Sequence, residues 1–220
     1  MKRRRASKIS IEDHYRNWFA QITMINQKET IKRRIQESIA VKTALFLNPH
    51  LMSQIENLAA TIKKTLCNNG KVILAGNGGS FTDSMHITAE LVSRFQEERK
   101  ALPAIALGTN NAILTAIGND YAFEEIFARE IMALGKPGDV FVGISTSGHS
   151  ENVIRAVHVA NKIGLTVYCL TGETGGLLKK QAECICVPSK ITARIQEAHI
   201  LIGHIVCELV EQAFVKSDPN

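Results

Sequence analysis

The chain has 220 residues, of which 45% are hydrophobic and 21% are charged, with a formal net charge of +5. This composition is typical of a globular protein and allows one sizeable α/β domain. Four of the first five residues are basic, so the remainder is close to neutral and lacks the basic body of a nucleic-acid-binding protein. No apolar run reaches the roughly 18 residues that span a bilayer, and no apolar segment of a secretory signal follows the basic start. We therefore expect a cytoplasmic protein with neither nucleic acid nor membrane as a partner.

The five cysteines show no spacing typical of a disulfide framework, which favours reduced thiols. Cys184 and Cys186 lie two residues apart in a strand-like run, so both side chains share a face of the strand. They form either a metal-binding pair or, as we favour, two small buried apolar side chains.

Residues 1–29 are charged and only weakly periodic, with Trp18, Phe19 and Ile22 on a short amphipathic segment. We expect a partly disordered basic extension there and a single domain over residues 30–216. Amphipathic helices are predicted over 31–47 and 51–66, ahead of the first strand. Their apolar stripes need a partner, and packing within an oligomer is one answer.

Strand and helix patterns alternate through the rest of the chain. Strands are predicted over 71–76, 101–107, 139–144, 165–170 and 184–187. Helices are predicted from 80 onward and over 111–117, 123–134, 151–163, 175–182 and 194–214. The alternation predicts right-handed crossovers and a three-layer αβα sandwich around a mainly parallel five-stranded sheet.

The first candidate site follows the first strand, at the turn Asn77-Gly78-Gly79-Ser80. Glycines here allow the backbone to approach a ligand closely, and a helix start after a strand is a typical anion site. Ser80 is the expected N-cap, with Asp83 three residues later. Met85, Ala89 and Val92 fall on one face of this helix.

The same helix carries His86 and Glu90, which lie four residues apart and therefore on one face. An anion-binding turn and a His/Glu pair on one element indicate a functional site.

The second candidate site is the run from Ser145 to Ser150, at the end of the third predicted strand. Four hydroxyl groups around Gly148, at the start of a helix, form a donor-rich loop suited to a phosphate. The run has no lysine or arginine and no G-x-x-x-x-G-K-[ST] pattern, which argues against a P-loop nucleotide site. A Ser-rich helix cap without a ligand is the simpler alternative.

The third candidate is the last helix, with polar residues on an otherwise apolar element. These are Gln196, Glu197, His199, His204 and Glu208. A lone histidine on such a helix is usually a hydrogen-bonded core residue, and on spacing alone this interpretation is favoured for His204.

Five motifs occur together in order between about Ile31 and Phe214. They are GNGGS with D-x-M-H-x-x-x-E-L at 76–91, GND at 118–120, GISTSG-x-S at 143–150, LTG at 170–172 and RIQE-x-H at 194–199. Together they resemble the phosphoheptose isomerases, a family with the SIS (sugar isomerase) fold, which is flavodoxin-like. Residues 1–29 lie outside the resemblance.

The resemblance implies a homotetramer that interconverts sedoheptulose 7-phosphate and D-glycero-D-manno-heptose 7-phosphate, the first step toward ADP-heptose for the lipopolysaccharide core. It implies one zinc ion per subunit among His86, Glu90, Gln196 and His204, with Glu90 and His204 as the acid/base pair. Substrate would be bound by Asn77, Gly78, Gly79, Ser80, Glu90, Arg94, Asn119, Asp120, Ser145, Thr146, Ser147, Ser150 and Gln196. An aldose–ketose exchange needs such a base, a proton relay and a cation to stabilise the oxyanion.

The implied metal ligands raise a geometric difficulty. Gln196 and His204 are eight residues apart, roughly 12 Å along an ideal helix. Gln196 would lie in an irregular lead-in, long side chains would bridge the gap, or the ligands would come from different subunits. The sequence departs from the family pattern at His149 and at Ala193, where some members have Asn and Asp.

Two other functions are open to a SIS-fold chain. One is the DnaA initiator-associating protein, a binding tetramer without the acid/base residues, which the presence of His86, Glu90 and His204 disfavours. The other is a sugar-phosphate-sensing module, which usually accompanies a further domain that 29 spare residues cannot form.

Overall fold

The structure, a computed structural model, describes residues 12 and 27–215. The predicted amphipathic segment around Trp18 lies outside the described residues. Contacts divide the chain into two units, Met1–Ala40 and Val41–Asn220. Helix α2 (Gln27–Phe46) begins in the first unit, where Ile31, Ile35 and Ile39 are each more than half exposed and follow one stripe.

The second unit contains a five-stranded parallel sheet with the strand order β2-β1-β3-β4-β5. The strands are β1 (Val72–Gly76), β2 (Ala104–Ala106), β3 (Val140–Ser145), β4 (Thr166–Thr171) and β5 (Glu183–Cys186). Gly76 pairs in register with Ile144, so the carboxyl ends of β1 and β3 are neighbours. The predicted parallel sheet is confirmed.

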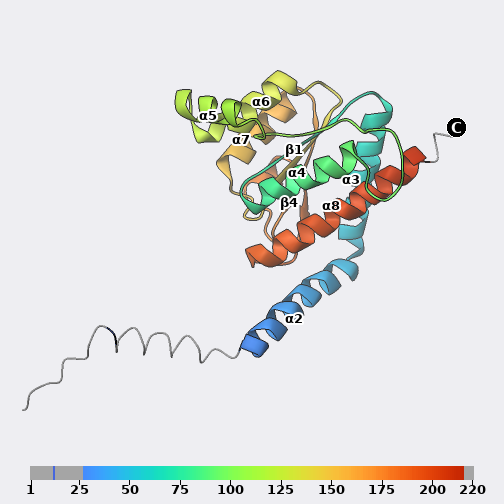
Figure 1. The fold of residues 1–220 in the computed structure, drawn as a ribbon, viewed down its shortest axis with the longest axis vertical. Coiled ribbons are helices and arrows are strands. Elements are labelled where there is room, and N and C mark those ends of the chain that lie inside the picture. The colour runs from blue at the N-terminus through green and yellow to red at the C-terminus, as the bar shows by residue number, and fades with distance from the viewer. Residues whose placement is uncertain (1–11, 13–26, 216–220) are drawn as a thin grey trace, which may run out of the picture. The chain divides into compact units, whose positions relative to one another are not determined.

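Helices cover both faces of the sheet (Figure 1). One layer contains α3 (Pro49–Cys67), α4 (Gly79–Val92) and α8 (Thr192–Val215), and the other contains α5 (Asn111–Asp120), α6 (Ile126–Leu134) and α7 (Glu151–Lys162). Strand residues alternate between the two cores: Leu74 and Val142 pack with the first layer, and Ile73 and Phe141 with the second. This period-two alternation is what two buried sheet faces require, and it confirms the three-layer sandwich.

Three predicted elements differ in the structure. The helix predicted over 175–182 is only a 3₁₀ turn, η2 (Leu178–Lys180), because Gly175 and Gly176 both have positive φ and cannot extend an α-helix. The strand predicted over 101–107 is shortened to β2. The helix predicted over 123–134 begins as a 3₁₀ turn, η1 (Phe123–Glu125), and continues as α6.

The predicted N-cap of α4 is also wrong. Gly78, with φ +55°, occupies the cap position, and the helix starts at Gly79, before Ser80. Ser80 is buried inside the first turn. The buried Oδ2 atom of Asp83 has no hydrogen-bond partner among the described residues, and burial raises the pKa of the Asp83 carboxyl. Because glycine has no Cβ, Gly78 can adopt this positive φ and serve as the cap two residues before Ser80.

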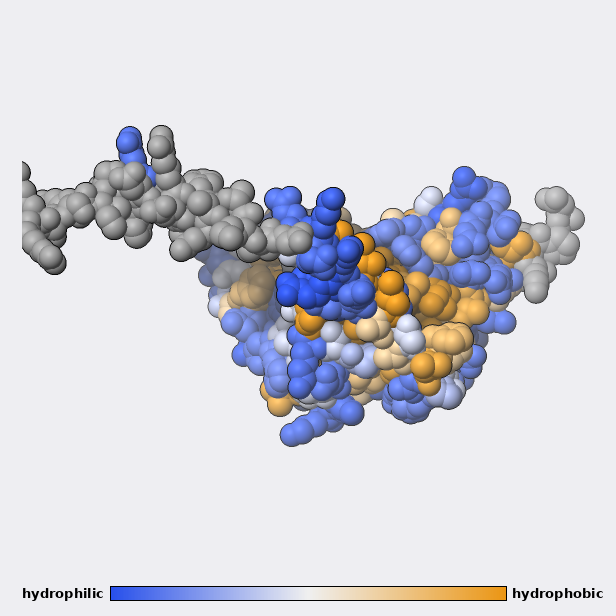
Figure 2. All heavy atoms as spheres, turned by 90° about the horizontal axis from the view of Figure 1, so that it is seen from below, coloured by the Kyte–Doolittle hydropathy of each residue, from blue (hydrophilic) through white to orange (hydrophobic). Residues whose placement is uncertain are grey.

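Helix α4 presents two different faces. Ile87 and Leu91 pack into the core, whereas Met85 and Val92, predicted to share a face, are both more than two-fifths exposed. Ile205 and Leu209 of α8 are exposed as well. Figure 2 shows apolar atoms gathered on one face of the molecule.

Helix α8 is long and apolar enough to cross a membrane by length and composition. Half of the apolar window is nevertheless buried inside the protein, where α8 packs against α3 and α4. One side of the helix is therefore packed as a core helix.

The cysteines of the sheet fit the favoured interpretation as small buried side chains. All five thiols are free. Cys184 is buried beside Cys169, its register partner on β4, and Cys186 Sγ accepts a hydrogen bond of 3.4 Å from Thr171 Oγ1.

His199 is a core histidine. Its side chain is fully buried on α8, and Nε2–H donates a hydrogen bond of 3.1 Å to the carbonyl oxygen of Thr171 at the end of β4. Burial lowers the pKa of His199 to about 4, although the bond to Thr171 opposes this shift. The folded protein therefore holds His199 neutral.

We predict that His199 makes the fold acid-sensitive. The unfolded chain takes up this proton near pH 6.5 and the folded protein only near pH 4, so the free energy of unfolding falls as pH drops across that window. The loss should reach on the order of 3 kcal/mol at pH 4. His199→Gln keeps a hydrogen-bond donor for Thr171 but has no titrating ring. Its free energy of unfolding, measured by chemical denaturation, should therefore depend less on pH. His158→Gln, at an exposed site on α7, is the control; identical slopes in all three proteins would contradict the prediction.

Candidate functional site

The turn after β1 is shaped for a ligand. The amide groups of Gly78 and Gly79 lie at the start of α4, before the first helical hydrogen bonds, and are not used by the helix itself. Gly79 also lies directly against the side chain of Gln196 on α8, since a Cβ there would be only 2.4 Å from Gln196 Nε2. Exposed amides at a helix start favour an anionic or strongly polar ligand.

A pair of asparagines joins this turn to the neighbouring loop. Asn77 Nδ2 donates to Asn152 Oδ1 at 2.8 Å, and Asn152 Nδ2 donates back to Asn77 Oδ1 at 2.9 Å. Asn152 is 2% exposed, at the start of α7. The side chain of Asn77, predicted to bind substrate, is thus paired within the protein and fixes the two loops relative to each other.

The loop after β3 brings the predicted hydroxyl groups together. Ser145 Oγ lies 2.9 Å from Ser150 Oγ, and the amide of Gly148 donates to both oxygens of Ser145. The amide of His149 donates to Ser147 Oγ at 3.1 Å. Ser147 remains exposed, so its hydroxyl group is accessible to a ligand.

The loop after β4, which contains Gly172 and Gly175, packs against the loop Ser145–Ser150, here called the serine loop. Gly148 has φ +68°, and a Cβ there would be 2.2 Å from the carbonyl oxygen of Gly175. Gly172 N donates to the carbonyl oxygen of Thr146 at 3.0 Å. A cavity of about 220 Å³ opens beside Thr146 and Ser147, with Lys190 on its rim.

Helices α4 and α8 assemble a second cluster of polar side chains. Glu90 Oε1 lies 3.0 Å from His86 Nε2, which lies 3.4 Å from His204 Nε2. The histidine rings meet edge to face, with centroids 5.0 Å apart. Glu90 and His204 are half-buried, and His86 is exposed. His86 and Glu90 of α4 thus converge on one point with His204 of α8, which follows them by 118 and 114 residues in the sequence.

This group can hold a metal ion. One potential ligand atom from each of the three side chains lies within 4.8 Å of the others. In a tetrahedral site with bonds of about 2.1 Å, two nitrogen ligands are about 3.4 Å apart, which is the separation of the two Nε2 atoms. Nitrogen and oxygen donors in this number suit zinc, with one position left for a non-protein ligand.

The two helices lie side by side in parallel, and three contacts define their register. Gly79 contacts Gln196, Ile87 contacts Gly203, and Phe95, just beyond α4, bonds through its amide to Glu211. Gln196 therefore lies opposite the start of α4, two turns before His204. The whole of Thr192–Val215 is one α-helix, so Gln196 is not in an irregular lead-in as one of our interpretations required. Within one chain, Gln196 belongs to the turn and not to the histidine pair.

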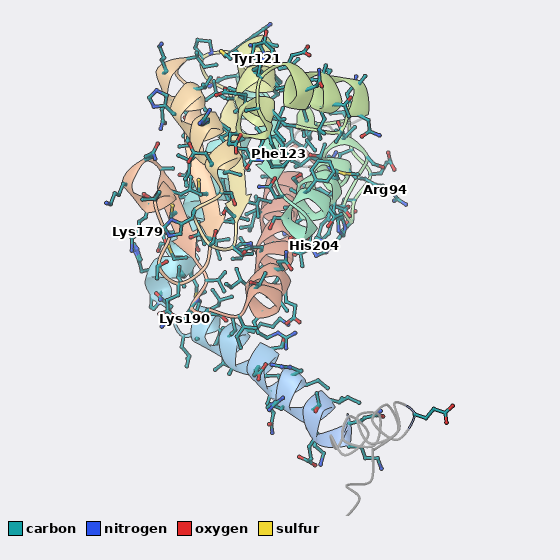
Figure 3. The ribbon with its side chains drawn as sticks, turned by 90° about the vertical axis from the view of Figure 1, so that its left-hand side faces the viewer. Arg94, Tyr121, Phe123, Lys179, Lys190 and His204 are labelled. Atoms are coloured by element: carbon teal, nitrogen blue, oxygen red, sulfur yellow. The ribbon has the colours of Figure 1, made fainter. Side chains whose placement is uncertain are left out.

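Three other predicted residues lie apart from these clusters. Asn119 and Asp120 are exposed at the end of α5, where Asn119 Nδ2 donates to Asp120 Oδ1 at 2.8 Å. Arg94 follows α4 and is 4.0 Å from Glu98. Figure 3 shows Arg94 on the same side of the molecule as His204, while Tyr121, next to Asp120, lies at the top of the view.

A larger cavity among the described residues lies away from these clusters. It measures about 790 Å³ and lies at the amino ends of the strands, where Lys71 and Asp139 form an ion pair. Ligands of open parallel sheets bind at the opposite, carboxyl ends, so cavity size does not identify the candidate site.

Sequence reasoning missed two residues that organise the site. Asn152 was detectable as a polar residue on the buried face of a predicted helix, since Val153, Ala156 and Ala160 share that face. Phe95 stacks on His204 with ring centroids 5.4 Å apart. Nothing in the local pattern indicates that contact.

Comparison with known proteins identifies the family. Residues 38–172 match the family described as "SIS domain". The chain is 49% identical over 188 residues to the phosphoheptose isomerase of Aneurinibacillus thermoaerophilus, covering 85% of this chain and 95% of the relative. It is 51% identical over 185 residues to that of Aquifex aeolicus, covering 84% and 96%.

Solved structures agree with these relatives. The phosphoheptose isomerase from Neisseria gonorrhoeae superposes with a TM-score of 0.79 at 40% identity, covering 85% of this chain and all of the other. The one from Francisella tularensis gives 0.80 at 37% identity, covering 86% and all of the other. The chain belongs to the SIS-domain family and, within it, to the phosphoheptose isomerases.

Proposed function

We propose that this chain is an aldose–ketose isomerase that interconverts sedoheptulose 7-phosphate and D-glycero-D-manno-heptose 7-phosphate through an enediol. The observation that carries the proposal is the convergence of Glu90 and His204, from two helices, on one point with His86. Relatives at about half identity named phosphoheptose isomerase support the same reaction. The reaction would be the first step toward ADP-heptose, in the cytoplasm.

The proton transfers fall to two side chains. Glu90 accepts the proton from one of the two reacting carbons and returns it to the other, since a carboxylate can serve as base and then as acid. His204 relays the hydroxyl proton between the two oxygens, a step that suits an imidazole. His86 stays within hydrogen-bond distance of Glu90 and keeps its carboxylate directed at the reacting carbons.

We propose zinc as the cofactor, one ion per subunit, held by His86, Glu90 and His204. When bound, it supplies the positive charge that stabilises the oxyanion of the enediol. Gln196 as a fourth ligand remains a prediction, and because it lies beside Gly79 within its own chain, we favour its contribution from another copy over bridging by long side chains.

The phosphate end of the substrate is assigned to the serine loop. Ser145, Thr146, Ser147 and Ser150 would bind the phosphate oxygens, and the turn at Gly78 and Gly79 would contact the sugar chain. Arg94, Asn119 and Asp120 remain proposed substrate contacts.

A homotetramer is supported by the surroundings of the acid/base group. His86 lies seven residues beyond Gly79, about 10 Å along the helix, so loop and acid/base group are separated within one chain. Exposed Met85, Val92 and Ile205 lie close in sequence to the three polar side chains. Exposed apolar side chains this close to the polar group favour burial of this surface against a further copy of the chain, which would also exclude water from the reaction.

A non-catalytic binding protein of the same fold is the second candidate. It would bind the DnaA initiator and would need no acid/base group. The presence of Glu90 and His204, each within hydrogen-bond distance of His86, disfavours it, and so do the names of the relatives.

The direct test is an assay with sedoheptulose 7-phosphate, before and after treatment with a chelator. We expect isomerisation by the untreated protein, loss of most of the turnover after chelation, and recovery on adding Zn²⁺, because the oxyanion needs a cation. A DnaA pull-down on the same preparation tests the second candidate. Absence of isomerisation in zinc-loaded, folded protein would refute the proposed function.

Glu90→Gln and His204→Ala should each lower kcat by roughly two to four orders of magnitude, the usual contribution of acid–base catalysis. Circular dichroism should show both proteins folded, because neither side chain is part of the core. Glu56→Gln and His158→Ala, at exposed sites on α3 and α7, are the matched controls and should retain wild-type turnover. Near-wild-type kcat in either test variant would remove that residue from the mechanism.

Ser147→Ala should raise KM for the phosphorylated substrate roughly tenfold or more and leave kcat nearly unchanged, because a hydrogen bond to a charged group contributes about 1.5–3 kcal/mol. Steady-state kinetics measures both constants. Ser53→Ala, at an exposed site on α3, should change neither. An unchanged KM in Ser147→Ala would argue against phosphate binding by this loop.

A further inference from the structure

The segment Ser93–Lys100, which follows α4, is fixed by a buried carboxylate. The amides of Phe95, Gln96 and Glu97 donate to the two oxygens of Glu211 at 2.8, 2.7 and 3.0 Å. Burial raises the pKa of the Glu211 carboxyl, but these three bonds and the nearby Arg99 outweigh it, so the pKa lies below its ordinary value. Glu211 is therefore ionised in the folded protein and holds the segment against α8.

Arg99 completes this arrangement. Its Nε lies 3.2 Å from Glu211 Oε1, with side chains 1% and 2% exposed. The guanidinium donates to the carbonyl oxygens of Leu91 at 2.9 Å and of Glu90 at 2.8 Å, in the last turns of α4. The pair thus ties the segment to both helices, and the backbone of Glu90 is one of the points of attachment.

The fixed segment carries Phe95 onto His204. The two rings stack with centroids 5.4 Å apart and an angle of 28° between their planes. The His204 ring also meets the His86 ring edge to face. Two neighbours therefore restrict rotation of the imidazole, and in this orientation its Nε2 faces His86 Nε2.

The spacing on α8 makes the arrangement possible. His204 and Glu211 are seven residues apart, two helical turns, and so point in the same direction from α8. The carboxylate that anchors the segment and the imidazole that its phenyl ring covers therefore belong to one face.

We propose that Phe95, anchored by Glu211 and Arg99, is a positioning residue for His204, which holds the imidazole in the orientation needed for proton relay and metal binding. The inference rests on the proposed function, in which His204 is one of the two acid/base groups. Displacing a catalytic group by about 1 Å commonly costs on the order of 10²-fold in rate.

The test compares Phe95→Leu with Phe95→Tyr. Leucine keeps apolar volume but cannot stack, so kcat should fall at least tenfold, with KM for sedoheptulose 7-phosphate within twofold of wild type. The Kd for Zn²⁺, measured by competition with a chelating dye, should rise at least tenfold. Tyrosine retains the ring and should restore both values to within threefold. Phe127→Leu, in the core of the other helical layer, should lower thermal stability but change neither constant.

A third readout needs no Phe95 variant. In metal-free wild-type protein, the His204 ring protons lie over the Phe95 face and should resonate upfield of those of exposed His158. Their signals are assigned by their absence in His204→Ala. Unshifted resonances would overturn the inference even where Phe95→Leu fails to fold.

The outcomes separate the two proposals. If His204→Ala abolishes turnover while Phe95→Leu keeps kcat and the Kd for Zn²⁺ within twofold of wild type, positioning by Phe95 is wrong and the proposed function stands. If His204→Ala retains full turnover, the acid/base assignment is wrong, and the Kd for Zn²⁺ and the ring-proton shifts still decide whether Phe95 orients His204.

Discussion

The site depends on how closely α4 and α8 approach each other. Gly203 permits this approach, because a Cβ there would be 2.6 Å from Ile87 Cδ1. Gly79 permits it again at the start of α4, where the side chain of Gln196 fills the space that a Cβ would occupy. A larger residue at Gly203 would force Ile87 out of a close-packed core, and such overpacking commonly costs 1–3 kcal/mol. His204 reaches His86 only because the helix axes are this near, so the acid/base group is a consequence of packing by small residues.

The loop cluster depends instead on the sheet. Strands β1 and β3 are neighbours although the chain passes through α4, β2, α5 and α6 between them. The strand order therefore changes direction between β1 and β3, and ligands of open α/β sheets bind at such a point. The reciprocal bonds between Asn77 and Asn152 join the two loops there. Helix α4 starts at this point and ends just before Phe95, so it connects the loop cluster with the group formed by His86, Glu90 and His204.

Much of the architecture could be predicted, because buried strands and amphipathic helices leave a periodic record in the sequence. The failures were local: positive φ at Gly175 and Gly176 prevented a helix whose residues otherwise favour one, and Gly78 took the cap expected at Ser80. The His86–Glu90 pair was predictable, since residues four apart share a helix face. Its meeting with His204 was not predictable from spacing, because 118 residues separate the histidines and tertiary contacts such as Gly203–Ile87 bring them together. The resemblance indicated that link, and the register of the helices places Gln196 of the same chain beside Gly79.

The separation of Gln196 from His204 bears on how the proposed metal site would be completed. Three ligands from one chain, with the fourth position open, form the kind of site that catalysis uses, whereas four protein ligands form a closed structural site. A Gln196 side chain from a second copy would occupy the position that a substrate oxygen needs. Within its own chain Gln196 lies against Gly79, at the turn proposed to contact the sugar chain. Within one chain, the register of α4 and α8 therefore places Gln196 beside Gly79, and His86, Glu90 and His204 together near the other end of α4.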